Sequence, residues 1–404
     1  MADTFLRPPV ELPERNAPVY LDYQATTPTD PRVVEAMLPY FLEKLGNPAS
    51  TSHFYGWEAE EAVEKAREQI ASLIGAEPRE IVFTSGATES NNIAIQGVSR
   101  FYKERKNHIV TAVTEHKCVL EACKHMEREG FDVTFLEVGS NGLLDLDSLK
   151  DAITENTALV SIMVVHNEIG VIQPVADIGA ICRERGVFFH TDAAQAVGKI
   201  PLDVNAMNID LLSISAHKVY GPMGIGVLYV RRRPRVRLLP LFQGGGQERG
   251  MRSGTLSTPL CVGMGEACAI AEQELHDEAN RLGHLKDMLY QGVMGRVPGI
   301  YLNGAADPRI PGNLNFSFDH VDGAGLIAGL KGISVSSGSA CTSGDVAPSY
   351  VLKALGVSDA LAFACVRIGL GRFTTAEDIE IAIETIVENV ALLRAANPEN
   401  KVSA

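Results

Sequence analysis

The chain has 404 residues, of which 46% are hydrophobic and 21% are charged, fractions that are typical of soluble globular proteins and exclude a disordered or collagen-like chain. Its formal net charge of −14 should repel polyphosphates, so we do not expect nucleic acid as a main ligand. No apolar run approaches the roughly 18 residues that span a bilayer, and the N-terminus lacks a signal-peptide pattern. We therefore expect a cytoplasmic protein without a membrane segment.

Helical and strand patterns alternate over the first two thirds of the chain. Helices are predicted for residues 31–45 and 56–74, with Asp30 as an N-cap and Gly75 as a stop. Short β-rich segments follow at 81–84, 108–113, 133–138, 159–165, 187–190, 211–215 and 226–230, and helical segments such as 118–129, 146–153 and 177–185 separate most of them. This alternation predicts an α/β fold with a mainly parallel sheet that is covered by helices on both faces.

The pattern changes after about residue 260. A long helix is predicted for 260–294, a strand for 313–318 and a terminal helix for 376–394. We therefore predict a large domain of residues 18–260 and a smaller α+β domain that consists of residues 1–17 and 261–404.

Polar residues follow the predicted strands, and the carboxyl ends of parallel strands meet at one edge of a sheet. In chain order they are Ala87 and Thr88, His116, Asn167, Asp192 and Gln195, and then Ser215, His217 and Lys218. The turn at Gly86 and the helix start that follows suit a phosphate, although a simple N-cap would also explain this segment. A single polar residue at a strand end is more often structural, but the convergence of so many at one edge indicates a functional site.

This set of side chains suits pyridoxal 5'-phosphate. Lys218 offers the amine that this cofactor needs for its covalent link, and Asp192 offers a carboxylate that keeps the ring nitrogen protonated. His116 can cover the ring face, Gln195 can donate to the phenolic oxygen, and the turn around Thr88 can hold the phosphate. We see no metal-binding pattern, because no CxxC motif occurs among the seven cysteines.

One cysteine stands in unusual surroundings. Six of the ten residues 335–344 are Ser or Gly, and Cys341 lies among them. A structural cysteine is normally packed among apolar residues, so we interpret Cys341 as a reactive thiol on a mobile loop of about residues 335–345, with an incidental cysteine as the alternative. The other six cysteines are expected to be small buried side chains: Cys118, Cys123, Cys182, Cys261, Cys268 and Cys365.

Taken together, these motifs resemble the cysteine desulfurases of the NifS/IscS type, which belong to the class-V aminotransferases. The matching segments are 21–28, 84–92, 114–116, 167–170, 190–195, 215–218, 250–255 and 336–343, and the likeness extends over about residues 18–394. The resemblance implies the aminotransferase-like fold type I, pyridoxal 5'-phosphate as the cofactor, and conversion of L-cysteine to L-alanine with a persulfide on Cys341.

The resemblance also implies a role for each residue. Lys218 would carry the cofactor; Ala87, Thr88, Ser215 and His217 would bind its phosphate, and Thr255 would reach the phosphate in the neighbouring subunit of a homodimer. His116 would stack on the ring and move protons, and Asn167, Asp192 and Gln195 would hold the ring. Arg367, with Asn167 nearby, would bind the substrate carboxylate, and Cys341 would pass the sulfur to an acceptor protein such as an iron–sulfur scaffold.

Two alternatives remain open. A selenocysteine lyase, or another enzyme of this fold that depends on the same cofactor, would act through Lys218 without needing Cys341. A protein-binding module with a vestigial site would instead use a basic cluster made of Arg231, Arg232, Arg233, Arg235 and Arg237. We interpret this cluster as a solvated loop, with the docking of an acidic partner as the second interpretation and nucleic acid as the least favoured. The chain ends soon after its final helix, without the longer tail of typical housekeeping members, so the sulfur acceptor stays open.

Overall fold

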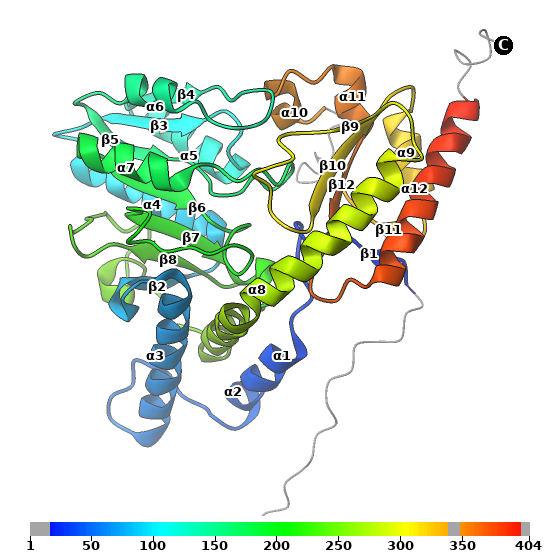
Figure 1. Ribbon diagram of the computed structural model, residues 1–404. Coiled ribbons are helices and arrows are strands. Elements are labelled where there is room, and N and C mark those ends of the chain that lie inside the picture. Colours follow the sequence, from blue (N-terminus) through cyan, green and yellow to red (C-terminus); the bar gives the residue numbers. More distant parts are fainter. Residues whose placement is uncertain (1–16, 338–347, 397–404) are drawn as a thin grey trace, which may run out of the picture.

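A seven-stranded sheet forms the centre of the larger part of the molecule, in a computed structural model that describes residues 17–337 and 348–396 (Figure 1). The strand order is β2–β8–β7–β6–β5–β3–β4. The strands are β2 Ile81–Thr84, β3 His108–Ala112, β4 Asp132–Leu136, β5 Thr157–Ser161, β6 Phe188–Asp192, β7 Leu211–Ser215 and β8 Gly226–Val230. All pairs from β7 to β4 are parallel, whereas β8 runs antiparallel to both of its neighbours. The predicted mainly parallel sheet is therefore confirmed.

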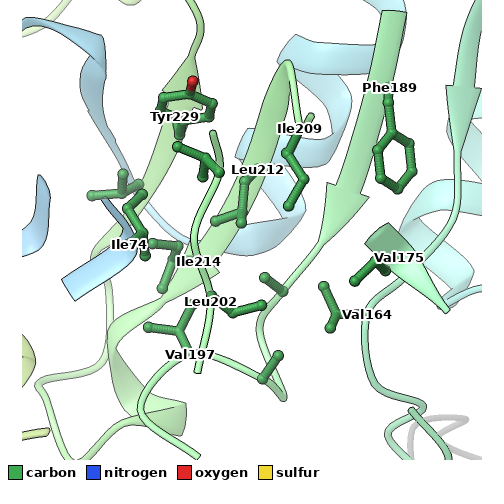
Figure 2. Packing of buried hydrophobic residues seen from close by; sticks show 14 of the residues in the cluster. Ile74, Val164, Val175, Phe189, Val197, Leu202, Ile209, Leu212, Ile214 and Tyr229 are labelled. Atoms are coloured by element: carbon green, nitrogen blue, oxygen red, sulfur yellow. The ribbon is translucent and has the colours of Figure 1, made fainter. Parts of the chain in front are cut away.

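Helices cover both faces of this sheet, because successive side chains of a strand point to opposite faces. Val82, Leu211 and Leu228 belong to the core that also contains apolar residues of α4 Ala87–Tyr102 and α5 Lys117–Arg128. The opposite face packs against α3 Phe54–Ile74, α6 Leu146–Ala152, α7 Val175–Arg185 and the first half of α8 Thr258–Met294. Figure 2 shows this second core, in which Phe189, Leu212, Ile214 and Tyr229 of three strands lie near Ile74 of α3 and Val175 of α7.

The smaller part of the molecule has its own core. Its strands β9 Ile300–Leu302, β10 Asn313–Phe318 and β12 Cys365–Gly369 form an antiparallel sheet in the order β12–β10–β9. Apolar residues of this sheet pack against α9 Gly323–Gly329, α12 Ala376–Ala396 and the second half of α8. Two short helices, α10 Tyr350–Ala354 and α11 Asp359–Phe363, precede β12. Since α8 contributes to both cores, it connects the two parts along its whole length (Figure 1).

Several strand ends differ from the prediction by a few residues, the largest difference being β5, predicted for 159–165 and observed as Thr157–Ser161. Two segments differ in their continuity or pairing. The helix predicted for 31–45 is divided into α1 Pro31–Met37 and α2 Pro39–Leu42, because Pro39 has no backbone N–H with which to continue the first helix. Strand β1 Val19–Tyr20 pairs in parallel with β11 Ile333–Ser334, so the start of the predicted large domain lies against the smaller part. The division at residue 260 stays a prediction, and most of residues 1–17 lie outside the described part.

The basic cluster is only partly a solvated loop. The guanidinium of Arg231 is buried and donates to the carbonyl oxygen of Ile209 at 3.0 Å and to Oδ1 of Asn205 at 3.0 Å. The interpretation as a solvated side chain is therefore wrong for Arg231, which connects the end of β8 to residues 204–209. The remaining arginines of the cluster, Arg232, Arg233, Arg235 and Arg237, are exposed. Within residues 17–337 and 348–396, we find no helix long and apolar enough to cross a membrane.

Candidate functional site

A cavity of about 610 Å³ lies where the parallel strands end, and it is large enough for a cofactor together with a small substrate. Its wall contains these predicted site residues: Ala87, Thr88, His116, Asn167, Asp192, Gln195, Ser215, His217, Lys218 and Arg367. The structure thus brings together residues that are up to 280 positions apart, Ala87 and Arg367 being the outermost pair. Thr255 does not line this cavity, and Cys341 lies outside the described residues.

The end of the cavity near β2 is built to receive an anion. Gly86 has a φ of +154°, a conformation that favours glycine, and it turns the chain from β2 directly into α4. No side chain of the described residues caps the first N–H groups of α4. Gly226 of β8 approaches so closely that a Cβ there would lie 2.6 Å from Cα of Gly86. The open helix start, together with Ser215 and His217 across the cavity, forms a cradle for a phosphate.

Lys218 reaches the cavity from the short 3₁₀ turn Ala216–Lys218, which directly follows β7. Its Nζ donates to the carbonyl oxygens of Gln24 and Ala25, the latter at 2.7 Å. Beside it, Nδ1 of His217 lies 3.0 Å from Oγ1 of Thr26. Burial lowers the pKa of His217 to about 4, and the charge of Lys218 contributes, so His217 is neutral at pH 7. The amine and its neighbour are therefore held by the N-terminal segment.

Asp192, the last residue of β6, has a tightly fixed carboxylate. Its Oδ1 accepts a hydrogen bond from the backbone N–H of Ala194 at 2.9 Å, and its Oδ2 accepts one from Nδ2 of Asn91 at 2.7 Å. The side chain is 8% exposed and lies in the cavity wall together with Lys218. A carboxylate so placed can pair with a protonated ring nitrogen, as the cofactor requires.

Lys199 was missed by sequence reasoning. Its Nζ donates to Oε1 of Gln195 at 3.0 Å, while Nε2 of Gln195 donates to the carbonyl oxygen of Gln24 at 2.9 Å. Burial and the nearby charge of Lys218 together lower the pKa of Lys199 to about 7. Because Lys199 follows the strand end by several residues, the pattern of strand ends gave no signal for it.

Arg367 comes from β12 of the smaller sheet. Its Nη2 donates to Oδ1 of Asp22 at 2.8 Å, and its Nη1 donates to the carbonyl oxygen of Asn167 at 3.1 Å. Its Nε is buried and has no hydrogen-bond partner among the residues that the structure describes. A buried donor of this kind calls for an acceptor, and a substrate carboxylate is the natural one for a guanidinium.

The prediction for the six remaining cysteines is confirmed for five and wrong for Cys118. The five buried thiols are Cys123, Cys182, Cys261, Cys268 and Cys365. Cys118 is only half-buried and lines the cavity, with its Sγ 3.0 Å from Nδ1 of His116 and 3.1 Å from Nδ2 of Asn91. It is the second residue of α5, and His116 is the N-cap of that helix. Its position two residues after His116, in the first turn of the helix, was the signal in the sequence that could have identified it.

The donor set fits pyridoxal 5'-phosphate. An amine, a fixed carboxylate, an open helix start and a buried guanidinium all line one cavity. Each can meet a different chemical group of the cofactor or of an amino-acid substrate.

Comparison with known proteins agrees with this arrangement. The chain matches the aminotransferase class-V family over residues 19–381. It is 58% identical over 381 residues to the cysteine desulfurase IscS of Rickettsia rickettsii (strain Iowa), which covers 94% of this chain and 93% of that protein. A solved structure of a NifS-like protein superposes with a TM-score of 0.86 at 39% identity, covering 93% of this chain and 100% of the other. A structure described as SspA in complex with cysteine superposes with a TM-score of 0.79 at 40% identity, covering 88% and 100%.

Proposed function

Because the chain belongs to the class-V aminotransferase family, we propose that it is a pyridoxal 5'-phosphate-dependent cysteine desulfurase that converts L-cysteine into L-alanine and transfers the sulfur. The family membership confirms the predicted resemblance and the fold type I class. One observation carries the proposal: Lys218, Asp192 and Arg367 line a single cavity of about 610 Å³.

Each residue contributes a distinct step of binding or proton transfer. Pyridoxal 5'-phosphate supplies an electron-withdrawing ring that stabilises negative charge at the substrate Cα. Lys218 would hold the cofactor through its amine and would take the proton from the substrate Cα. The negative charge of Asp192, whose two oxygens are both held by protein donors, would keep the ring nitrogen protonated. Arg367 orients the substrate through the carboxylate, using the Nε donor that has no partner among the described residues.

We assign the acceptance of sulfur to Cys341, with His116 as the base that deprotonates its thiol. Cys341 lies outside the described residues, so the support comes from its sequence and from the flanks of its segment. On one side, the hydroxyl of Ser336 donates to Oδ2 of Asp22 at 2.6 Å, beside Arg367. On the other side, the hydroxyl of Ser349 donates to Oε2 of Glu168 at 2.7 Å. Both flanks are therefore anchored at residues next to the cavity wall.

In the sulfur transfer, the thiolate of Cys341 would attack the sulfur of the bound substrate. A new S–S bond forms, the bond between that sulfur and Cβ breaks, and its electron pair stays on Cβ. Cβ then takes a proton, L-alanine leaves, and a persulfide remains on the enzyme. An acceptor protein such as an iron–sulfur scaffold takes the outer sulfur from it.

The test uses protein purified with its cofactor and incubated with L-cysteine, with and without a thiol reductant. We expect alanine and sulfide in equal amounts in the presence of reductant. Lys218→Ala should abolish the visible absorption band and both products, whereas Cys341→Ala should keep the band and lose both products. Cys123→Ala, which removes a buried thiol of α5, is the matched control and should behave like the wild type.

The same variants separate the alternatives. A selenocysteine lyase would still form alanine from L-selenocysteine after Cys341→Ala. A binding module with a vestigial site would show no Lys218-dependent visible band at all. Alanine without a matching amount of sulfur product would contradict the desulfurase.

We also propose that two copies of the chain form a homodimer with shared sites. Six large apolar side chains around α2 and the start of α3 are each more than half exposed: Phe41, Leu42, Leu45, Phe54, Tyr55 and Trp57. An exposed group of this size is typical of an interface. Thr255 does not line the cavity of its own chain, which agrees with a role in the neighbouring site.

Mixing a variant of weakened cofactor binding with an inactive one tests the shared site. Thr255→Val should weaken cofactor binding, and Lys218→Ala should be inactive. A mixed dimer of the two variants contains one site with both Lys218 and a Thr255 from the other chain, so mixing should restore activity. A monomer in light scattering, or no recovery on mixing, would contradict the proposal.

A further inference from the structure

Two walls of the cavity are joined by a continuous chain of hydrogen bonds. Asn91 of α4 is fully buried, and its Nδ2 lies 2.7 Å from Oδ2 of Asp192 and 3.1 Å from Sγ of Cys118. The sulfur in turn lies 3.0 Å from Nδ1 of His116. The chain therefore runs from the carboxylate at the ring nitrogen to the imidazole expected over the ring, through Asn91 and Cys118, which have no other role so far.

The donors of this chain follow one direction. The backbone N–H of Cys118 donates to Nδ1 of His116 at 3.3 Å, so Nδ1 is an acceptor. The amide of Asn91 has two hydrogens, one for Asp192 and one for Cys118. Since the sulfur accepts from Asn91, its own S–H is free to donate to Nδ1. Both contacts of Cys118 therefore fall on Nδ1 of His116 and fix the orientation of the imidazole ring.

We propose that Asn91 and Cys118 are positioning residues that fix Asp192 and His116 relative to each other. The inference rests on the proposed function, because Asp192 and His116 act as a pair only when the cofactor ring lies between them. Asn91 occupies Oδ2 of Asp192, and Ala194 occupies Oδ1, so the carboxylate cannot rotate freely. Cys118 holds the imidazole through its thiol and its backbone N–H. A change at Cys118 therefore reaches Asp192 through Asn91.

Several titratable groups lie near His116. Glu115, His166 and Glu168 interact with it electrostatically. Burial raises the pKa of Glu115 well above its ordinary value and lowers that of His166 to about 4. Burial also raises the pKa of Glu168, whose carboxyl accepts from Ser349, to about 7, so the charge of Glu168 changes near neutral pH. Further charged groups nearby are Lys117 of α5 and the cavity residues Glu89, Asp192, Lys218 and Arg367. These groups are the same in the wild type and in the variants, so a shift between them reports the change at Cys118 or Asn91.

The experiment follows the visible band of the holoenzyme during a pH titration. Cys118→Ala removes the link without touching Asp192, and we expect it to shift the midpoint by about 0.5 pH unit, the size expected for one neutral hydrogen bond. Asn91→Leu should shift the midpoint in the same direction. The double variant should shift it no further than the larger single change, because both variants interrupt one chain. Cys118→Ser keeps a donor and an acceptor and should restore the wild-type midpoint.

A second readout does not depend on activity or on the folding of the Asn91 variant. Nitrogen NMR of labelled histidine in the holoenzyme reports on Nδ1 of His116, and Cys118→Ala, which keeps the backbone N–H but loses the thiol, should shift this resonance. Cys123→Ala, on the same helix, is the control and should change neither readout. An unchanged titration and an unchanged Nδ1 resonance in Cys118→Ala would overturn the inference. A wild-type protein without a Lys218-dependent band would instead refute the proposed function, so the two failures are distinguishable.

Discussion

Replacing Arg367 with lysine should raise the KM for L-cysteine and leave kcat much less affected. The guanidinium donates to Asp22 through Nη2 and to Asn167 through Nη1, and its Nε has no partner among residues 17–337 and 348–396. A carboxylate along the Nε edge would accept two parallel charge-assisted hydrogen bonds. Lysine keeps the charge but can supply only one such bond in a fixed geometry.

The expected size follows from the loss of one charge-assisted bond. Such a bond contributes about 1.5–3 kcal/mol, which corresponds to an increase of about 10- to 150-fold in KM. The assay is the initial rate of alanine formation at increasing concentrations of L-cysteine. Arg309→Lys is the matched control, since Arg309 is also buried but donates to Ala305, Asn303 and Asn313 and does not line the cavity. An unchanged KM together with a lower kcat in Arg367→Lys would refute the carboxylate role.

Three further predictions concern charge, packing and backbone. Burial raises the pKa of Glu168 from 4.5 to about 7, so this carboxyl contributes stability below pH 4.5 that is lost as the pH rises through 7. Glu168→Gln should remove up to about 3 kcal/mol of this pH dependence, seen as a smaller difference between the thermal midpoints at pH 5 and pH 8. Glu248→Ala should cost about 3–5 kcal/mol, because it leaves the buried Arg67 without its partner at 2.9 Å. Glu64→Ala, which removes an exposed partner of the same arginine, should cost less than about 1 kcal/mol, and equal losses of thermal stability would contradict this difference. Gly86→Ala should weaken cofactor binding by about tenfold or more in a titration of the apoenzyme, because alanine is strained at a φ of +154°. Gly130→Ala, at a φ of +87° away from the cavity, should strain the chain without changing cofactor affinity.

The order of the elements was predictable because their residues follow simple periods. Strands β2, β7, β8 and β10 begin and end where the sequence places them, since each is a short buried run bounded by polar or glycine-containing turns. The reversed direction of β8 was not predictable, because a strand buried on both faces has the same pattern in either direction. The pairing of β1 with β11 was not predictable either, because each strand has only two residues, too few for a hydrophobic period, and the two strands meet only in the tertiary fold.

The site was predictable where it depends on strand ends and not where it depends on the second sheet. Asp192 and Ser215 are the last residues of β6 and β7, so the rule for parallel sheets places them together. Arg367 lies in the middle of β12 in the other sheet, and only the family resemblance indicated it. Its partner Asp22 comes from the segment after β1, which no local pattern connects with β12.

The two cysteines of α5 show that residue type alone does not distinguish a core cysteine from one in the site. Both were expected to be buried, and Cys123 is, because it lies on the face of α5 that packs against the sheet. Cys118 lies five residues earlier, which at 3.6 residues per turn places it about 140° around the helix. It is also in the first turn, two residues after the N-cap His116, and this turn lines the cavity. The same reasoning applies to Ala87 and Thr88, which begin α4 after β2 and line the same cavity. In a parallel sheet, the distance of a residue from the helix start therefore decides whether a small side chain belongs to the core or to the site.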